Sequence, residues 1–379
     1  MNDTPVKNHV CRNVGNLVQK RIDHLKIGHK MQDLPEELWH ESFKFYMNDP
    51  TRKGGPNMRI IKLMPNRPSL TVTGYIFNKF VHPFENRYIT VREAARLQGF
   101  PDDLEFMGSL ASTQQQVGNA VPVHLARAVL ESVVSVLKNA NAVENNTLSA
   151  LSLFSGAGGF DLGAEQVNIN GCKIETKLCT DLWHDACLTL RNYFKERVIV
   201  VEGDVSKVEN PSQFYQTYTQ LKSLPDIIYG GPPCQSFSQA GKQKGVLDLR
   251  GSLVFEFMRF VEDIQPKAFI MENVSNLKGI AEGKLLENLV TEFSKLGYNA
   301  EAKVLTAADY GSPQLRKRIF IIGIKQTIGS PKFPIPSHCA DLSFLEKPYT
   351  TVSEAFKGLP KAKSNNLKNE IMPQFSEIQ

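Results

Sequence analysis

Short apolar runs alternate with longer amphipathic stretches between residues 149 and 324, and this alternation organises most of the chain. Runs rich in Val, Ile, Leu and Phe that end in polar or glycine residues are typical of buried strands. Such runs, with helices between most of them, predict an α/β fold whose mostly parallel sheet is covered on both faces. The predicted strands are 149–154, 174–180, 198–202, 225–229, 267–271, 301–305 and 318–324.

Two helices are predicted before this region. Thr90, followed three residues later by Glu93, forms a capping-box pattern that starts a short helix, and Gly99 ends it. A second helix should span 123–138, with Leu125, Ala128, Val129 and Val133 on one face. Residues 139–148, rich in Asn, predict a solvated linker between this helix and the first strand.

Composition narrows the class of protein only modestly. The chain has 379 residues, 41% hydrophobic and 22% charged, which suits a soluble globular protein of two domains. A net charge of +5 suits a polyanionic partner, although a mildly basic enzyme without nucleic acid remains an alternative. Six cysteines without C-x-x-C spacing favour reduced thiols in the cytoplasm, and no apolar stretch approaches the ~20 residues of a membrane span.

The sequence around Cys234 is the strongest chemical signal. The predicted strand 225–229 runs into Gly-Gly-Pro-Pro and then the thiol, which places Cys234 at the carboxyl edge of the sheet, where open α/β sheets bind ligands. A lone cysteine is by default a small buried hydrophobic residue. Here a polar loop follows it, so the sequence favours a nucleophile.

A second edge feature is the glycine loop after strand 149–154. The dinucleotide pattern G-x-G-x-x-G fails, because its third glycine would fall at Asp161. Asp181 and Asp204 follow the next two strands and could hold ribose hydroxyls and an adenine amine, with Val205 against the adenine face. With Phe154 beside a sulfonium, this set suits S-adenosylmethionine better than a nicotinamide cofactor, although each acid alone could be a solvated strand end.

The same segments resemble the DNA (cytosine-5) methyltransferase family over nearly the whole chain. The resemblance implies a Rossmann-like S-adenosylmethionine-binding sheet with a second, smaller and irregular DNA-recognition domain. The motifs that carry it are Phe-Ser-Gly-Ala-Gly-Gly at 154–159, Gly-Gly-Pro-Pro-Cys-Gln at 230–235, Asp-Leu-Arg-Gly at 248–251, Met-Glu-Asn-Val at 271–274, Gln-x-Arg-x-Arg at 314–318 and Gln-Val-Gly-Asn-Ala-Val-Pro at 116–122.

The order of these motifs departs from the family pattern. The Gly-Asn-Ala segment and the Arg-Tyr-Ile-Thr-Val-Arg-Glu-Ala-Ala-Arg-Leu segment come last in the family and first here, which is interpreted as a circular permutation. A flexible linker costs only ~0.6 kcal/mol per doubling of length, so 139–148 could join the relocated helix to the first strand. The expected domains are a small target-recognition domain from 1–116 and 327–379 and a catalytic domain at 117–326.

The resemblance also assigns roles. Cys234 adds to carbon 6 of cytosine, Glu272 engages the ring at N3 and the exocyclic amine, Arg318 lies nearest the base and thiol, and Arg316 helps to orient them. Because Gln314, Arg316 and Arg318 alternate, they should share one face of a strand, with a solvated edge strand as the alternative. Burial should raise the pKa of Glu272.

The predicted cofactor contacts come from the glycine loop, from three strand ends and from the relocated segment 116–122. For Asn119 in that segment, a simple turn residue is the alternative. No metal is expected. The predicted contacts are Phe154, Ser155, Gly156, Gly158, Gly159, Asp181, Leu182, Asp204, Val205, Pro232, Asn119 and Ala120.

The predicted activity is therefore methylation of carbon 5 of a flipped-out cytosine in a specific double-stranded DNA sequence. By family analogy the protein is a monomeric bacterial or phage-encoded modification enzyme, with a restriction endonuclease as genetic partner and no membrane association. An RNA cytosine methyltransferase would use the same thiol chemistry. A non-catalytic DNA-binding relative would lack the thiol, the acid or the arginines, all of which this sequence contains.

Overall fold

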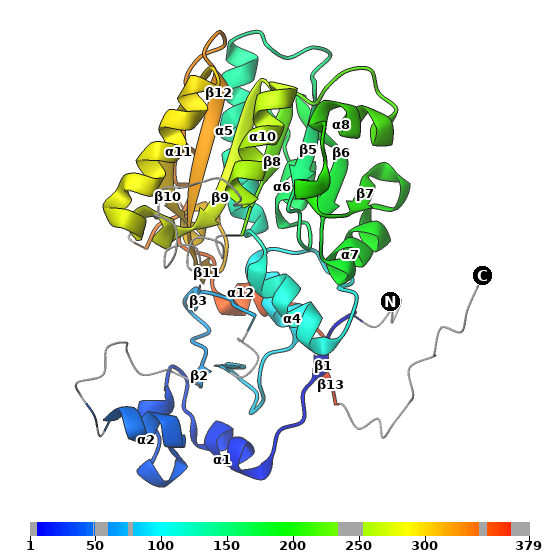
Figure 1. Ribbon diagram of the computed structural model, residues 1–379. Helices are drawn as coiled ribbons and strands as arrows, with labels where there is room; N and C mark the ends of the chain where they lie inside the picture. Colours follow the sequence, from blue (N-terminus) through cyan, green and yellow to red (C-terminus); the bar gives the residue numbers. More distant parts are fainter. Residues whose placement is uncertain are drawn as a thin grey trace.

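The computed structural model describes residues 6–47, 49, 60–74, 79–233, 253–340 and 347–364. In this part of the chain, one large sheet with helices on both faces forms the upper half of Figure 1. A less regular region of short helices and strands lies below it in the same view. The predicted α/β class is confirmed, whereas Cys234 and the loop that follows it lie outside the described residues.

The sheet contains all seven strands that the sequence pattern predicts. Their order is β10-β12-β9-β8-β5-β6-β7. Strands β5 to β9 pair in parallel, and β12 runs antiparallel to both β9 and β10. The strands are β5 (Thr147–Leu153), β6 (Lys173–Asp181), β7 (Ile199–Glu202), β8 (Ile227–Gly230), β9 (Ala268–Val274), β10 (Tyr298–Thr306) and β12 (Lys317–Lys325).

The central strand β8 shows why both faces need a helical cover. Ile227 and Tyr229 belong to the hydrophobic cluster on one face of the sheet, and Ile228 belongs to the cluster on the other face. This follows from the two-residue repeat of a strand, which sends successive side chains to opposite faces. The covering helices are α5 (Val123–Asn139) and α6 (Gly159–Glu165) on the first face, and α8 (Pro211–Thr219), α10 (Leu253–Ile264) and α11 (Lys284–Lys295) on the second.

Both helices predicted ahead of the sheet are present. Thr90 caps α3 (Val91–Gln98), its hydroxyl accepting from the Glu93 N–H and the Glu93 carboxylate accepting from the Thr90 N–H. Gly99 ends the helix at φ +85°, a left-handed conformation that suits glycine. Helix α5 buries Leu125, Val129 and Val133 as predicted, while Ala128 is only partly buried.

The connection from α5 to β5 is a short turn. It spans 140–146 and contains asparagines at positive φ, so the helix extends one residue further and the strand begins slightly earlier than the sequence suggests. The helical segment Leu110–Asn139 is long and apolar enough by composition to cross a membrane, which the sequence-based prediction excluded. Most of its apolar window, 61%, is buried against the rest of the protein, as in the core helix of a globular domain.

The irregular region has a small core of its own, in which Ile22, Met31, Phe43 and Val81 are buried together. Helix α3 instead shares a hydrophobic cluster with residues of α6 and the sheet-covering helix α7.

The domain limits at 116 and 327 stay a prediction. The remaining elements are β1 (Val10–Cys11), α1 (Asn16–His24), η1 (Met31–Asp33), η2 (Glu36–Leu38), α2 (Glu41–Met47), β2 (Ile61–Lys62), β3 (Ser69–Leu70), β4 (Phe80–Val81), α4 (Leu110–Asn119), α7 (His184–Phe194), η4 (Lys195–Arg197), η5 (Val205–Lys207), η6 (Ser275–Gly283), η7 (Ala307–Tyr310), β11 (Gln314–Leu315), α12 (Val352–Phe356) and β13 (Lys363–Ser364).

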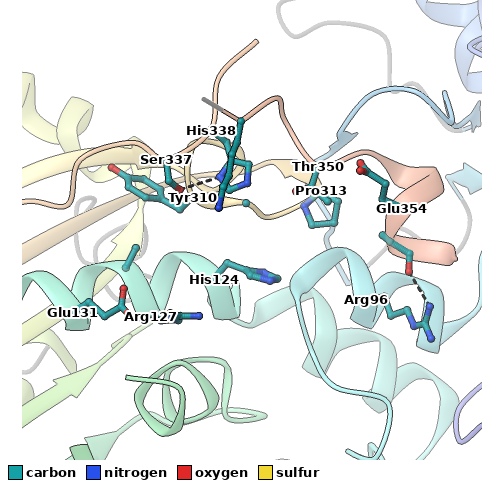
Figure 2. Close-up of a pocket in the computed structure, with 14 residues that line it drawn as sticks. Arg96, His124, Arg127, Glu131, Tyr310, Pro313, Ser337, His338, Thr350 and Glu354 are labelled. Atoms are coloured by element: carbon teal, nitrogen blue, oxygen red, sulfur yellow. Dashed lines mark hydrogen bonds and ion pairs between the residues drawn. The ribbon is translucent and has the colours of Figure 1, made fainter. Parts of the chain in front are cut away.

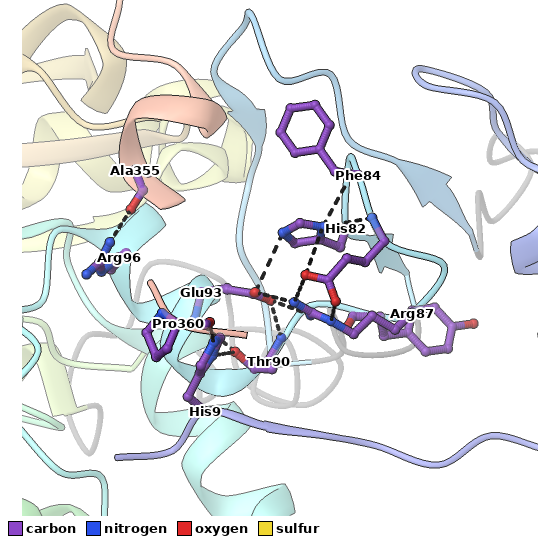
Figure 3. Close-up of polar contacts among 11 residues, drawn as sticks. His9, His82, Phe84, Arg87, Thr90, Glu93, Arg96, Ala355 and Pro360 are labelled. Atoms are coloured by element: carbon purple, nitrogen blue, oxygen red, sulfur yellow. Dashed lines mark hydrogen bonds and ion pairs between the residues drawn. The ribbon is translucent and has the colours of Figure 1, made fainter. Parts of the chain in front are cut away.

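Segments from opposite ends of the chain meet beside α3. Strand β1 pairs in parallel with β13. The buried His9 ring bridges the Thr90 hydroxyl and the Pro360 carbonyl, at 2.9 and 2.8 Å, as Figure 3 shows. Arg96 of α3 donates to the carbonyl of Ala355 at 3.0 Å. The first and last described segments of the chain are thus held to the same helix.

A buried ionic cluster stabilises this junction (Figure 3). Arg87 lies between Glu85 and Glu93 and donates to both carboxylates at 2.7–3.1 Å. Burial alone would raise the pKa of Glu93, but its interactions with Arg87 outweigh burial and hold this pKa below its ordinary value. The His82 ring lies 3.7 Å from Glu93 and stacks on Phe356 of α12.

We predict that Arg87→Met lowers the free energy of unfolding by about 3–5 kcal/mol, because it leaves Glu93 as a buried carboxylate without its cation. Urea unfolding at pH 7 measures the loss. The matched control is Arg127→Met, which removes the more exposed pair with Glu131 and should cost less than about 1 kcal/mol. Equal losses in the two variants would show that the cluster adds no more than a surface pair.

Candidate active site at the carboxyl edge of the sheet

A cavity of about 1000 Å³ lies where the parallel strands β5 to β9 end. Of the described residues predicted from the sequence, only Gly158 does not line it, and Cys234 lies outside the described residues. The structure therefore brings the predicted cofactor residues together with Glu272, Arg316 and Arg318. The predicted residues that line the cavity are Asn119, Ala120, Phe154, Ser155, Gly156, Gly159, Asp181, Leu182, Asp204, Val205, Pro232, Glu272, Arg316 and Arg318.

The glycine loop forms one wall of the cavity. Strand β5 ends at Leu153, and the next residue, Phe154, has a positive φ of 55° that turns the chain. Gly158, at φ +84°, is the N-cap of α6 and so shapes the loop without lining the cavity. At Gly159 a Cβ atom would lie 2.2 Å from the Val121 carbonyl oxygen. Only glycine allows the loop to pack this closely on the segment after α4.

Asp181 fastens this loop to the end of β6. Its carboxylate accepts from the Gly156 N–H at 2.7 Å and from the Trp183 N–H at 2.8 Å. Burial raises the pKa of Asp181 above its ordinary value, although these backbone hydrogen bonds act in the opposite direction. The predicted contact of Asp181 with a ribose is untested, and the structure adds a positioning role that the sequence did not suggest.

Trp183 is a lining residue that the sequence interpretation missed. It is the N-cap of α7, two residues after Asp181, and it is partly exposed beside the highly exposed Leu182. An aromatic side chain directly after a strand end is the signal that could have identified it. Across the cavity, Asp204 caps η5 through the Ser206 N–H, and Val205 is buried beside it.

The ends of β8 and β9 bring a carboxyl group close to the backbone that leads to Cys234. The Asn273 side-chain amide donates to the Pro232 carbonyl at 2.9 Å and so links the two strand ends. A Cβ atom on Gly231 would lie 2.9 Å from Glu272 Oε2. Glycine at this position therefore lets the Glu272 carboxyl approach the chain three residues before Cys234.

Glu272 and Arg318 form an ion pair inside the cavity wall. Arg318 Nε lies 2.7 Å from Glu272 Oε1, and both side chains are largely buried. Burial raises the pKa of Glu272 above its ordinary value, and the charges of Arg318 and Arg316 reduce that rise. The expected direction of the Glu272 pKa shift is confirmed. A carboxyl of raised pKa can hold a proton closer to neutral pH than an exposed one.

The prediction that Gln314, Arg316 and Arg318 share one strand face is wrong. The strand is interrupted at Arg316, because β11 pairs with β3 of the irregular region while β12 begins at Lys317 and joins the main sheet. Arg316 is 1% exposed and donates to the carbonyls of Val72 and Gly118 at 2.5 and 2.9 Å. Burial lowers the pKa of Arg316 to about 9.

A buried polar network around Asp161 connects α6, which follows the glycine loop, to strands β6 and β8. Asp161 Oδ1 accepts from the Tyr229 hydroxyl at 2.9 Å and from the Cys179 thiol at 3.2 Å. Asp161 Oδ2 has no hydrogen-bond partner among the described residues. Burial raises the pKa of Asp161, and the hydrogen bonds from the Cys179 thiol and the Tyr229 hydroxyl only reduce the rise.

A second cavity, of about 550 Å³, lies between α3, α5 and α12 and contains none of the predicted site residues (Figure 2). Its lining includes His124, Arg127 and His338. His124 Nδ1 has no hydrogen-bond partner in the described part of the chain, and it packs over Gly99, where an added Cβ would approach it to 2.5 Å.

Comparison with known proteins finds a matching family model and related sequences. The sequence model of the family described as C-5 cytosine-specific DNA methylase matches residues 5–135 and 148–379. The chain is 37% identical over 233 residues to the Type II methyltransferase M.NgoFVII of Neisseria gonorrhoeae, covering 61% of this chain and 58% of that protein. It is also 37% identical over 230 residues to the Type II methyltransferase M.AquIA of a Picosynechococcus strain, covering 56% of this chain and 89% of that protein.

The match to the gonococcal relative spans less than two thirds of that protein's length. Among solved structures, the chain is similar to a candidate DNA modification methyltransferase encoded within an E. coli prophage. The two are 28% identical with a TM-score of 0.44, covering 56% of this chain and 55% of that one.

We predict that Asp161→Asn makes the stability of the protein less dependent on pH. A carboxyl with a raised folded-state pKa contributes stability below its unfolded-state value of 3.8, and this contribution is lost as pH rises through the folded-state pKa. The asparagine keeps an acceptor for Tyr229 but cannot ionise. Urea unfolding at pH 5 and pH 8 should therefore show the variant gaining on the wild type at the higher pH, by up to about 1.4 kcal/mol per unit of pKa shift. A difference that stays constant between the two pH values would contradict this.

Proposed function

The chain belongs to the C-5 cytosine-specific DNA methylase family, and from that premise we propose that it transfers a methyl group from S-adenosylmethionine to carbon 5 of cytosine in double-stranded DNA. One observation carries the proposal. The buried Glu272 carboxyl, held by Arg318, lies in the same cavity as the glycine loop and next to the backbone that leads to Cys234.

In the proposed reaction the Cys234 thiolate adds to carbon 6 of the cytosine ring. A thiol is a strong nucleophile and later a competent leaving group, which this reversible addition requires. As the sulfur–carbon bond forms, negative charge moves toward N3, and the protonated Glu272 carboxyl donates a hydrogen bond or its proton there. The raised pKa of Glu272 suits this role, because part of the population then holds a proton near neutral pH.

Arg318 has two functions in this scheme. Its ion pair orients the Glu272 carboxyl, at 2.7 Å, and its positive charge lines the same cavity, where it would stabilise negative charge that develops on the ring. After methyl transfer, carbon 5 loses its hydrogen as a proton to water or a base. The sulfur–carbon bond then breaks, releasing the thiolate and 5-methylcytosine.

The cavity fits S-adenosylmethionine by size and by the groups that line it. When bound, this cofactor supplies the electrophilic methyl group. The glycine loop would allow close backbone approach of the methionine end, Phe154 would offer an aromatic face to the sulfonium, and Asp204 and Trp183, which line the same cavity, would contact the adenine. The sulfonium would face the same cavity as Glu272, which is the arrangement that transfer to carbon 5 needs.

A cytosine in a stacked duplex cannot reach this cavity, so the reaction requires base flipping, at a cost of a few kcal/mol. We propose that the irregular region, from 1–116 and 327–379, recognises the DNA sequence around the flipped base. Several relatives are named Type II methyltransferases, which supports a role in protecting a DNA site from a partner endonuclease in a bacterial or phage-infected cell. We infer that the protein acts as a monomer.

We also propose that the chain is a circular permutation of the family order. The family match falls into two segments divided at 136–147, where α5 passes directly into β5 through the turn 140–146. The pairing of β1 with β13 and the contacts of His9 with Pro360 bring the two ends of the described chain together. Both observations support a small domain assembled from the two chain ends.

The nucleophile is tested by covalent trapping. Duplex DNA that carries 5-fluorocytosine should form an irreversible adduct at Cys234 in the presence of S-adenosylmethionine, because the fluorine at carbon 5 cannot leave as a cation. Peptide mass spectrometry locates the adduct. Cys234→Ser should lose the adduct completely, and Glu272→Gln should slow its formation by about 100-fold or more.

Cys339→Ser is the matched thiol control and should react like the wild type, because Cys339 is a partly exposed thiol that does not line the main cavity. A duplex RNA of the same sequence is included as a competitor. Trapping of RNA in preference to DNA would overturn the DNA assignment, and an adduct on any other cysteine would overturn the mechanism.

The permutation is tested by rearranging the chain. A variant that starts at residue 147, joins residue 379 to residue 1 through a Gly/Ser linker and ends at residue 146 should fold with an unchanged melting temperature and methylate the same DNA site, mapped by bisulfite sequencing. The control opens the chain between Val129 and Leu130, both fully buried in α5, and should not fold. Loss of folding in both variants would argue against the permuted order.

A further inference from the structure

Val72 of the irregular region is held at both of its backbone polar groups by the segment that precedes β12. Gln314 Oε1 accepts from the Val72 N–H at 3.2 Å. Arg316 donates to the Val72 carbonyl at 2.5 Å. All these groups are buried, so neither backbone group of Val72 can exchange its partner for water without opening the contact.

The same side chains reach the C-terminal end of α4. Arg316 donates to the Gly118 carbonyl at 2.9 Å. Gln314 donates its amide to Gln98 Oε1 at 2.6 Å, and Gln98 in turn donates to the carbonyls of Val117 at 2.7 Å and Ala120 at 3.4 Å. Two glutamines in a hydrogen-bonded relay therefore connect the Val72 N–H to the end of this helix. Arg316 makes a second connection, from the Val72 carbonyl to the Gly118 carbonyl.

The relay gives hydrogen-bond partners to buried backbone groups at both of its ends. The last carbonyls of a helix have no partner within the helix, and Gln98 and Arg316 supply partners for those of α4. A cation at a helix C-terminus is also favoured by the helix dipole, which helps Arg316 to remain charged although it is buried. Both glutamines are 0% exposed. Removing either amide would leave a buried backbone group without this partner: the Val117 carbonyl if Gln98 is lost, and the Val72 N–H if Gln314 is lost.

The two segments that the relay joins also touch directly, at the wall of the main cavity. A Cβ atom on Gly118 would lie 2.0 Å from the Gly74 nitrogen and 2.3 Å from the Thr73 carbonyl carbon. Thr73, Gly74, Gly118, Asn119 and Ala120 all line that cavity. A shift of the Val72–Gly74 backbone therefore cannot occur without moving the turn after α4.

We infer that Gln98 and Gln314 are positioning residues that hold the C-terminal end of α4, Gly118–Ala120, in shape for the cofactor and make cofactor affinity depend on the position of the Val72–Gly74 backbone. The inference rests on the proposed function, because the affinity in question is that for S-adenosylmethionine. Neither glutamine lines the cavity, so neither is expected to touch the cofactor or the base.

The test uses the full chain with Gln98→Met and Gln314→Met, which keep side-chain length but remove the amide. Isothermal titration with S-adenosylmethionine should give a Kd about 5–20-fold higher in each variant. The double variant should be no weaker than the weaker single variant, because both changes break the same relay. At saturating cofactor, kcat should stay within about threefold of the wild type, since the reacting groups are untouched.

The matched control is Tyr298→Phe, which removes another buried hydrogen bond, to the Pro266 carbonyl, at the far end of the sheet. It should lower the melting temperature to a similar extent and leave the Kd unchanged. If Gln98→Met does not fold, Gln98→Asn keeps the polarity at a lower cost in stability and should give the same rise in Kd.

Two failures can be told apart. Glutamine variants that lose stability like Tyr298→Phe but bind the cofactor like the wild type would overturn the inference alone. A wild-type protein that does not bind S-adenosylmethionine would overturn the proposed function, and the inference with it.

Discussion

The site depends on one buried carboxyl group whose charge is only partly compensated. In the described part of the chain Glu272 pairs with Arg318, and it stands at the end of a strand that is buried on both faces. Parallel pairing of β8 and β9 fixes its distance from the neighbouring strand end, and glycine at position 231 keeps that gap free of a side chain. A carboxyl held so tightly cannot escape burial by turning to solvent, so its raised pKa follows from the strand pairing itself.

Much of the fold could be predicted from the sequence because the sheet obeys a simple rule. Most of its strands are short apolar runs followed by polar or glycine residues, whereas β6 and β10 alternate polar or charged residues with apolar ones, and all seven segments form strands of the same sheet. The capping box at Thr90 and Glu93 is equally local, since the two residues satisfy each other's backbone groups. Most of the predicted cavity residues were found for the same reason: parallel strands that end together bring their next residues together.

The misses have a common physical cause, which is that they depend on contacts between distant segments. Alternation placed Arg316 on a strand face with Arg318, but pairing of β11 with β3 breaks the strand and turns Arg316 toward Val72 and Gly118. The contacts of Asp181 with the Gly156 N–H of the glycine loop and with the Trp183 N–H were not predicted either, and the predicted contact of Asp181 with a ribose stays a prediction. The apolar stretch ending at Asn139 resembles a membrane span by composition only because a core helix needs the same residues.

The hydrogen bonds that hold Val72 have a thermodynamic consequence for the binding of DNA and of the cofactor. If the irregular region binds DNA as proposed, a segment of it that also shapes the wall of the main cavity would couple DNA binding to cofactor binding. Such coupling is reciprocal: whatever factor DNA adds to cofactor affinity, the cofactor must add to DNA affinity. A positive coupling would make the protein without cofactor bind DNA more weakly and the loaded protein remain longer on its target.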